Sequence, residues 1–342
     1  MNMVERSICG LTAGEIFDLI NPEGFTMKHA VSVSNYIYKK HNSDISLCEK
    51  IPKKLREILS NRAETGIFFP IKEIVSIDKS VKYLFRTGSG KEFETVYIPD
   101  GKRHTVCVST QSGCRMGCSF CATGEVGFKG NLTAGEIVNQ IIVLPQADKI
   151  THVVFMGMGE PMDNLDNVIK ACNIITAEWG MALSPRNVTV STVGILTGIE
   201  QFLKETECNL TFSLYSPFAS ERAKGIPVDS RHPFQKVLDL MKNFKVRKGR
   251  RLSVAYMMIQ NINDTDSHLQ ELILILKGAS LRVNLIPYHS YKKGQNISSS
   301  KERMQHFKHN LIISGISASI RKSRGTDISA ACGLLAASSV IR

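Results

Sequence analysis

The chain has 342 residues, of which 43% are hydrophobic and 22% charged, a composition that suits one large globular core with a small extra domain and excludes a disordered or fibrous protein. Nine cysteines are too few for a disulfide scaffold in a chain of this length. No apolar run is long enough to cross a bilayer, and Met1 to Arg6 lack the apolar core of a secretory signal. We therefore expect a cytoplasmic protein with reduced thiols. The net charge of +12 includes two basic stretches, at 245–251 and 281–342, which favour nucleic acid as a partner over a merely solvated basic face.

The first 90 residues are expected to form an accessory helical domain with linking strands. Residues 15–20 and 53–59 have helix-like patterns with basic and apolar faces and carry no chemical motif. A strand-like segment follows at 68–98. We expect residues 91–342 to form a second unit, which carries the chemistry.

From about residue 105, strand-like runs rich in β-branched residues alternate with amphipathic segments. The six expected strands are 105–110, 151–156, 187–191, 209–214, 252–257 and 283–286. The expected helices are 133–144, which opens with the capping-box pair Thr133 and Glu136, then 163–178, 232–245, 264–277 and 299–313. Such an alternation predicts parallel strands joined by right-handed crossovers. The fold class is therefore α/β, an open or closed β/α barrel with its chemistry where the strands end.

Three cysteines, Cys114, Cys118 and Cys121, follow the first expected strand with the spacing C-x3-C-x2-C. Structural zinc requires four closed ligands, and the next cysteine along the chain, Cys172, is far away in a helix-like segment. In an iron–sulfur cluster, three thiolates would hold three irons and leave the fourth open to an outside ligand. A partial zinc knuckle, or cysteines that only pack, are the alternatives.

Polar residues and glycines follow several other expected strands. They include the segments 157–161, 191–194 and 213–216, and Asn284 within the last strand. Glycine permits close backbone approach to a ligand, while carboxylate, hydroxyl and amide groups can hydrogen-bond an amino acid and a ribose. Each motif alone is explained by turn chemistry, but their convergence on one barrel mouth indicates a binding site.

With these motifs the sequence resembles the radical S-adenosylmethionine (SAM) RNA adenine methyltransferases, in particular those that methylate C2 of an adenine in 23S rRNA, at the peptidyl transferase centre, and in tRNA, next to the anticodon. The resemblance spans nearly the whole chain and is strongest at 94–99, 107–121, 157–161, 284–287 and 321–333. It implies a radical SAM partial (β/α)6 barrel with a small N-terminal helical domain that helps to bind RNA. It also implies a 4Fe-4S cluster held by Cys114, Cys118 and Cys121, and two SAM molecules per turnover.

The resemblance further implies a mechanism. SAM methylates Cys332, and a second SAM yields a radical that takes hydrogen from the S-methyl group. The carbon then adds to the adenine, and Cys107 attacks Cys332 to form a disulfide and release the product. Glu94 would be the proton-accepting carboxylate near the adenine, although an ordinary strand glutamate is the simpler interpretation of that residue alone.

The SAM contacts that the resemblance implies are Gly159, Glu160, Ser191, Ser213, Leu214, Tyr215 and Asn284. Tyr215 stands where the family usually has His in a Ser-Leu-His pattern, so the contact made by this ring is left open. The resemblance also implies 23S rRNA and tRNA as partners, a reductant such as flavodoxin, no membrane association and a monomer.

Two alternative functions remain open from the sequence. A related family methylates C8 of the same rRNA adenine, confers antibiotic resistance and shares the same thiols; Pro161 and the run 321–325 favour the C2 enzymes. The chain could instead be a non-catalytic RNA-binding protein with a structural metal. Iron and sulfide in the reconstituted protein, as opposed to one zinc, would separate the enzyme from the binding protein.

Overall fold

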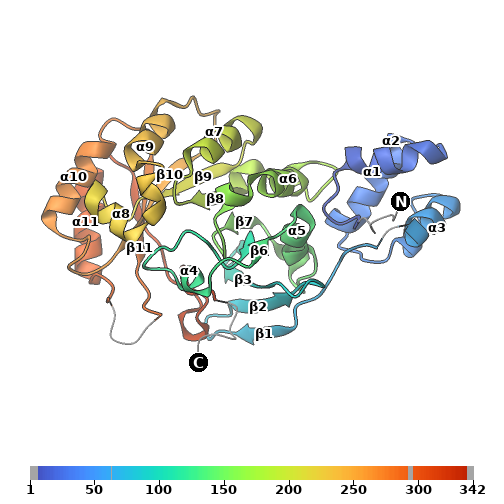
Figure 1. The fold of residues 1–342 in the computed structure, drawn as a ribbon, viewed down its shortest axis with the longest axis horizontal. Coiled ribbons are helices and arrows are strands. Elements are labelled where there is room, and N and C mark those ends of the chain that lie inside the picture. Colours follow the sequence, from blue (N-terminus) through green and yellow to red (C-terminus); the bar gives the residue numbers. More distant parts are fainter. Residues whose placement is uncertain (1–6, 63, 292–295, 337–342) are drawn as a thin grey trace.

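A computed structural model describes residues 7–62, 64–291 and 296–336 (Figure 1). The expectation for Met1 to Arg6 therefore falls outside the described residues. Its centre is a ten-stranded sheet in the order β1-β2-β3-β4-β7-β8-β9-β10-β11-β12. The parallel strands are β4 (Arg103–Cys107), β7 (His152–Phe155), β8 (Val188–Thr192), β9 (Asn209–Ser213), β10 (Leu252–Met258), β11 (Arg282–Pro287) and β12 (Ala318–Ile320). All six expected strands are present and the sheet is open, which confirms the partial barrel.

Helices lie between successive parallel strands along the chain (Figure 1). They are α4 (Ala122–Val126), α5 (Ala134–Ile142), α6 (Leu165–Thr176), α7 (Leu196–Glu205), α8 (Ala219–Gly225), α9 (Phe234–Asn243), α10 (Asp266–Leu276) and α11 (Lys301–Ile313). The capping box that opens α5 is confirmed, because Glu136 N–H donates to Thr133 Oγ1 at 3.1 Å and Thr133 N–H to Glu136 Oε2 at 2.8 Å. The sequence analysis missed α4, α7, α8 and the three-residue strand β12.

Three antiparallel strands extend the sheet before β4. They are β1 (Lys72–Val75), β2 (Val81–Arg86) and β3 (Glu92–Asp100), and β3 pairs with β4. The strand-like segment expected at 68–98 is therefore part of the central sheet. Two short strands, β5 (Gln111–Ser112) and β6 (Gly130–Asn131), form a separate pair. They lie beside residues 113–121, which carry the three cysteines of the motif and which we call the cysteine loop.

The N-terminal helices are α1 (Ala13–Ile20), α2 (Met27–Ser34) and α3 (Lys53–Arg62), and they agree with the helical patterns at 15–20 and 53–59. They contact the barrel through a close approach of Gly10 to Gly135 and an ion pair of 2.6 Å between Glu15 and Lys170. The domain division at residue 90 stays a prediction. No helix within the described residues is long and apolar enough to span a membrane.

The remaining helical segments are single turns. They comprise the π-helix η2 (Asn35–Lys39) and the 3-10 turns η1 (Asn21–Glu23), η3 (Ile45–Leu47), η4 (Ala147–Lys149), η5 (Pro161–Asn164), η6 (Pro185–Asn187), η7 (Pro227–Ser230) and η8 (Thr326–Ile328). Of these, η5 and η8 border the candidate site: η5 begins directly after Glu160 and η8 lies shortly before Cys332.

Candidate active site

Two cavities open at the carboxyl ends of the parallel strands and share part of their walls. The loop cavity, of about 960 Å³ including its open mouth, is lined by the three cysteines of the C-x3-C-x2-C motif and by residues of β7 to β11. The basic cavity, of about 1200 Å³ including its open mouth, is lined by residues of β3, β4, β7 and β11 and by the segments 321–324 and 330–335. The residues that line both are Met156, Ile286, Arg321, Cys332 and Leu335.

The loop cavity has the donor set that an iron–sulfur cluster requires. Cys114, Cys118 and Cys121 all line it, and burial raises the pKa of Cys114 to about 12 and that of Cys118 well above its ordinary value. Buried thiols of this kind ionise only when a cation replaces the proton. Among the described residues, no three His, Cys, Asp or Glu side chains converge on a position for a single metal ion. The thiolates of an iron–sulfur cluster bind separate irons, so they need not converge on one metal position.

Gly159 brings the chain close to the cavity wall. Its φ of +99° is in a region that L side chains rarely adopt, and a Cβ there would lie 2.6 Å from Gln111 Cβ. Only glycine fits both demands. The backbone of Gly159 consequently faces the loop cavity, as the sequence analysis expects.

Glu160 links the ends of two neighbouring strands. Its side chain accepts hydrogen bonds from Met162 N–H at 3.0 Å and from Val193 N–H at 2.9 Å, and the residue is 2% exposed. Burial raises the pKa of Glu160 to about 7, although bonds from the Thr192 side chain and from the two backbone N–H groups act in the opposite direction. This carboxyl group lines the loop cavity and can bind a cation.

Ser191, Ser213 and Asn284 also line the loop cavity. Ser191 Oγ and Ser213 Oγ lie 3.5 Å apart on neighbouring strands, and Ser319 Oγ donates to Asn284 Oδ1 at 3.1 Å. The structure thus brings five of the seven predicted SAM contacts together with the three cysteines.

Leu214 and Tyr215 lie elsewhere. Leu214 is fully buried in the core, and Tyr215 stacks on Phe120 with ring centroids 5.1 Å apart. Neither is among the residues that line the two cavities, because the chain turns at Tyr215, whose φ is +66°. The structure therefore does not bring these two side chains to the predicted cofactor site; Tyr215 instead supports the cysteine loop from behind.

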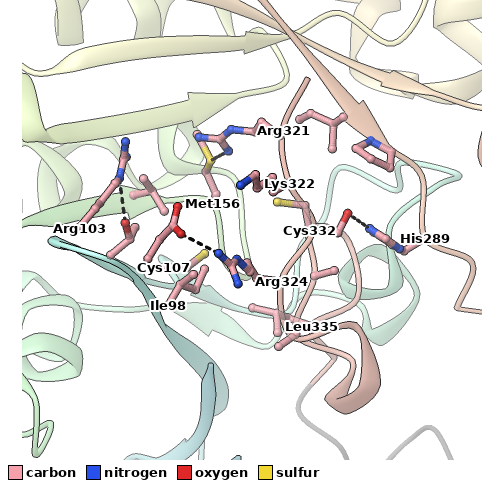
Figure 2. A pocket seen from close by; sticks show the side chains of 18 residues that line it. Ile98, Arg103, Cys107, Met156, His289, Arg321, Lys322, Arg324, Cys332 and Leu335 are labelled. Carbon is pink, nitrogen blue, oxygen red and sulfur yellow. Dashed lines mark hydrogen bonds and ion pairs between the residues drawn. The ribbon is translucent and has the colours of Figure 1, made fainter. Parts of the chain in front are cut away.

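Cys107 and Cys332 enter the basic cavity from opposite sides (Figure 2). Cys107 ends β4, and Cys332 follows the turn η8 near the end of the described chain. Burial raises the pKa of Cys107 to about 12, with a further increase from the charge of Cys332 and a decrease from Arg321. The two thiols are therefore electrostatic neighbours in one cavity.

Four cationic side chains surround these thiols (Figure 2), namely Arg103, Arg321, Lys322 and Arg324. Only one of the four has a close carboxylate partner among the described residues, because Arg324 Nη2 lies 2.7 Å from Asp100 Oδ1. Burial, and then the nearby charge of Arg321, lower the pKa of Arg103. An excess of positive charge at this depth is suited to a polyanion.

Glu94 lines neither cavity. It is 1% exposed, its Oε1 lies 3.1 Å from Lys82 Nζ, and its Oε2 accepts a hydrogen bond from Ala336 N–H at 2.9 Å. In this arrangement the carboxylate contacts the protein's own chain and not the space next to Cys107 and Cys332. Its role as proton acceptor stays a prediction.

Several cavity residues were missed by the sequence analysis. They are Thr211, which is two residues before the predicted Ser213 on β9, and Ala255 and Met257, which are two apart on β10; all line the loop cavity. Because side chains two apart share a strand face, this alternation was the available signal. Arg321 was noted only as part of a matching motif, and its place on both cavities became visible only in the fold.

The fold and this site define a radical SAM enzyme, and residues 108–274 match the family model of the Radical SAM superfamily. A solved radical SAM methyltransferase from Sphaerobacter thermophilus superimposes with a TM-score of 0.90 at 35% identity, over 97% of this chain and 99% of that one. The chain is 40% identical to a probable dual-specificity RNA methyltransferase RlmN from Bacteroides fragilis, over 97% of both chains. It is 37% identical to the dual-specificity RNA methyltransferase RlmN from Halorhodospira halophila, over 93% of this chain and 89% of the relative. The chain belongs to the RlmN family of radical SAM RNA methyltransferases.

Proposed function

We propose that this chain methylates C2 of an adenine in 23S rRNA and in tRNA, with Cys332 as the carrier of the transferred carbon. The relatives that it matches over nearly their full length are dual-specificity RNA methyltransferases. The observation that carries the proposal is the position of Cys332 on the wall shared by the two cavities. A carrier thiol has to meet the methyl donor on one side and the RNA base on the other.

The loop cavity would hold the cofactors of the family. Cys114, Cys118 and Cys121 would bind a 4Fe-4S cluster, Gly159 and Glu160 the amino end of SAM, and the remaining polar residues of the cavity the rest of SAM. When bound, the cluster and SAM supply a methyl group and a radical that removes a hydrogen atom. The ionised carboxyl group of Glu160 would orient the cationic amino group of SAM.

The two thiols have complementary tasks. The Cys332 thiolate would form a C–S bond to the methyl carbon as that carbon leaves the sulfonium of SAM. Later, the Cys107 thiolate would attack Cys332 Sγ, which forms an S–S bond and breaks the S–C bond. The electron pair of that bond passes to the carbon now attached to the base, which takes up a proton and becomes the methyl group of the product. The one electron that the radical adduct loses needs an acceptor, which the bound cluster would supply. An external thiol reductant would then return the disulfide to two thiols.

The basic cavity would bind the RNA. Arg103, Arg321 and Lys322 provide positive charge beside the thiols, and an unpaired adenine could enter from the open side. The proton that leaves the adenine carbon needs an acceptor, and for Glu94 to act in this way its bonds to Lys82 and Ala336 would have to open.

Further expectations belong to the same proposal. A flavodoxin-type protein would supply electrons, the enzyme would act as a monomer in the cytoplasm, and residues 1–90 would help to grip RNA as an accessory domain. Light scattering of the purified chain tests the monomer, and RNA binding by residues 91–342 compared with the full chain tests the accessory domain.

The deciding experiment is nucleoside mass spectrometry. The reconstituted protein is incubated anaerobically with SAM, a reductant and either unmodified 23S rRNA fragments or tRNA, and the digests are compared with 2-methyladenosine and 8-methyladenosine standards. We expect 2-methyladenosine in both RNAs and none with Cys332→Ala. An 8-methyladenosine product would assign the C8 reaction, and zinc in place of iron and sulfide would assign the structural-metal protein.

A further inference from the structure

The segment that carries Cys332 is attached to the barrel at several points. We call residues 329–336 the Cys332 arc. Ala122 N–H donates to Gly333 O at 2.8 Å, and Thr123 Oγ1 donates to Leu335 O at 2.6 Å. These bonds tie the middle of the arc to α4, which begins directly after Cys121. The position of Cys332 is therefore coupled to the cysteine loop.

One buried ion pair holds both ends of the arc. Lys82 Nζ lies 3.1 Å from Glu94 Oε1 and donates to Ser329 O at 3.4 Å, at the beginning of the arc. Glu94 Oε2 accepts from Ala336 N–H at 2.9 Å, at its end. Lys82 is 7% exposed and Glu94 is 1% exposed. Cys332 lies between Ser329 and Ala336, so the ion pair holds the chain on both sides of this cysteine.

The start of the arc also has a backbone conformation that needs support. Ser329 has a φ of +53°, which is costly for a residue with a side chain, and the bond from Lys82 reaches its carbonyl. Just upstream, Asp327 accepts bonds from Ser76 Oγ at 2.5 Å and Ile77 N–H at 3.0 Å. The arc is thus attached at the turn between β1 and β2 as well as at the ion pair.

We propose that Lys82 is a positioning residue for Cys332: its ion pair with Glu94 holds the Cys332 arc so that the thiol faces Cys107 across the basic cavity. The inference deepens the proposed function and rests on it, because Cys332 needs a fixed place only if it carries the methyl group. It also gives Glu94 a second task in addition to the proton-accepting role that the family resemblance implies.

Physical reasoning favours a role in positioning over one in stability. Desolvation of two charges offsets much of their attraction, so burial of this pair is weak evidence for a stabilising role. Its bonds to Ser329 O and from Ala336 N–H point instead to the position of the arc. Arg86 and Glu92 form an ion pair of 2.6 Å on the same two strands, β2 and β3. The side chain of Arg86 is 56% exposed, and among the described residues neither side chain has a hydrogen bond to the arc. Arg86→Met is therefore a matched control for Lys82→Met.

The test measures two rates in the full-length, cluster-loaded protein without RNA or SAM. The first rate is alkylation of Cys332 by iodoacetamide, and the second is formation of the Cys107–Cys332 disulfide in oxidised glutathione. Trypsin releases residues 325–342, in which Cys332 is the only cysteine, so mass spectrometry reports both. Free motion of the arc exposes Cys332 to reagent and lowers its effective concentration near Cys107.

For Lys82→Met we expect alkylation of Cys332 to become about fivefold faster and disulfide formation about fivefold slower. Lys82→Arg, which keeps the charge and the donors, should restore both rates to near the wild-type values. Arg86→Met should change neither. A general loss of stability would also expose the buried thiol of Cys172 to iodoacetamide. Faster alkylation of both cysteines, or unchanged rates in Lys82→Met, would therefore overturn the proposal.

A second variant covers the case in which Lys82→Met does not fold. Lys82→Met with Glu94→Gln removes both charges and keeps an acceptor for Ala336 N–H, and it should also separate the two rates in opposite directions. Wild-type rates in this double variant would likewise overturn the proposal. Neither rate depends on turnover, so these outcomes test the positioning role of Lys82 alone. The proposed function is tested separately, because it would be overturned if Cys332→Ala still methylated RNA fully.

Discussion

Cys332 and Cys107 enter one cavity from opposite sides, although one thiol ends the first parallel strand and the other lies near the end of the described chain (Figure 2). Their closeness is also electrostatic, because the charge of Cys332 raises the pKa of Cys107. The two thiols therefore share one cavity and influence each other's charge. Each thiol should therefore have a distinct effect when it is removed.

Cys107→Ala should stop the reaction after the carbon has reached the RNA. With no thiol to attack Cys332 Sγ, the bond between Cys332 and the RNA remains, and a covalent adduct accumulates. A denaturing gel of labelled tRNA, followed by mass spectrometry of residues 325–342, measures it. Cys172→Ala, which removes a buried thiol from α6, should form no adduct. Multiple turnovers by Cys107→Ala would show that another group releases the product.

SAM binding should weaken in acid because of Glu160. Burial raises the pKa of its carboxyl group to about 7, and only the ionised form attracts the cationic amino group of SAM. The dissociation constant should therefore rise by up to about tenfold per pH unit below pH 7 and be nearly constant above it. Calorimetric titration of the cluster-loaded protein between pH 5.5 and 8.5 measures this. Glu160→Gln should bind more weakly and lose the pH dependence; an unchanged profile would exclude Glu160 as the contact.

The sequence predicted those parts of the fold in which local pattern and burial agree. β8 and β10 are short runs of β-branched and apolar residues, and both lie where the sequence analysis expects strands. The capping box of α5 was equally local. By contrast, β12 has only three residues, too few to show a pattern, and it becomes a strand by pairing with β11.

The site was predictable where residues follow a strand end and less so where distant segments meet. Glu160 follows β7 and Ser213 ends β9, and both line the loop cavity, at the strand ends where the sequence analysis expects a binding site. Tyr215 was placed at the cofactor by its neighbour in the motif, but a turn of the chain directs its ring to Phe120. The contacts of Glu94 with Lys82 and Ala336 depend on packing of the last segment, which no local pattern reports.

Arg222 should be required for stability. Its guanidinium group is fully buried, lies 2.8 Å from Asp229 Oδ1, and donates to the carbonyl oxygens of Val193 and Ser213 at 2.6 and 2.7 Å. Arg222→Met leaves a buried carboxylate and unpaired carbonyl groups, so the free energy of unfolding should fall by about 3–5 kcal/mol. Urea unfolding followed by circular dichroism measures it.

A surface arginine provides the control for that measurement. Arg247 pairs with Glu207 at 2.9 Å but is 81% exposed, so Arg247→Met should change the free energy of unfolding by less than about 1 kcal/mol. Similar losses in both variants would mean that the network around Arg222 contributes no more than a surface ion pair.

Gly225→Ala should displace the ring of Tyr215 and so destabilise the cysteine loop, which this ring contacts through Phe120. A Cβ at this position would lie 2.1 Å from Tyr215 Cε1, so the ring would have to leave its stack on Phe120, next to Cys121. Gly225 O also accepts a hydrogen bond from Ser119 N–H at 3.0 Å, within the same loop. We expect a loss of about 1–3 kcal/mol in unfolding free energy and a lower iron and sulfide content after reconstitution.

Two further variants separate the clash from a general effect of alanine. Gly14→Ala, in the helix α1 where the nearest atom to a new Cβ is 3.8 Å away, should be neutral or slightly stabilising. Tyr215→Ala combined with Gly225→Ala relieves the clash but leaves a cavity in place of the buried ring, so stability should not recover. Cluster content should also stay low, because the stack on Phe120 is still missing. Full cluster content in the double variant would show that Tyr215 is a packing residue with no influence on the cysteine loop.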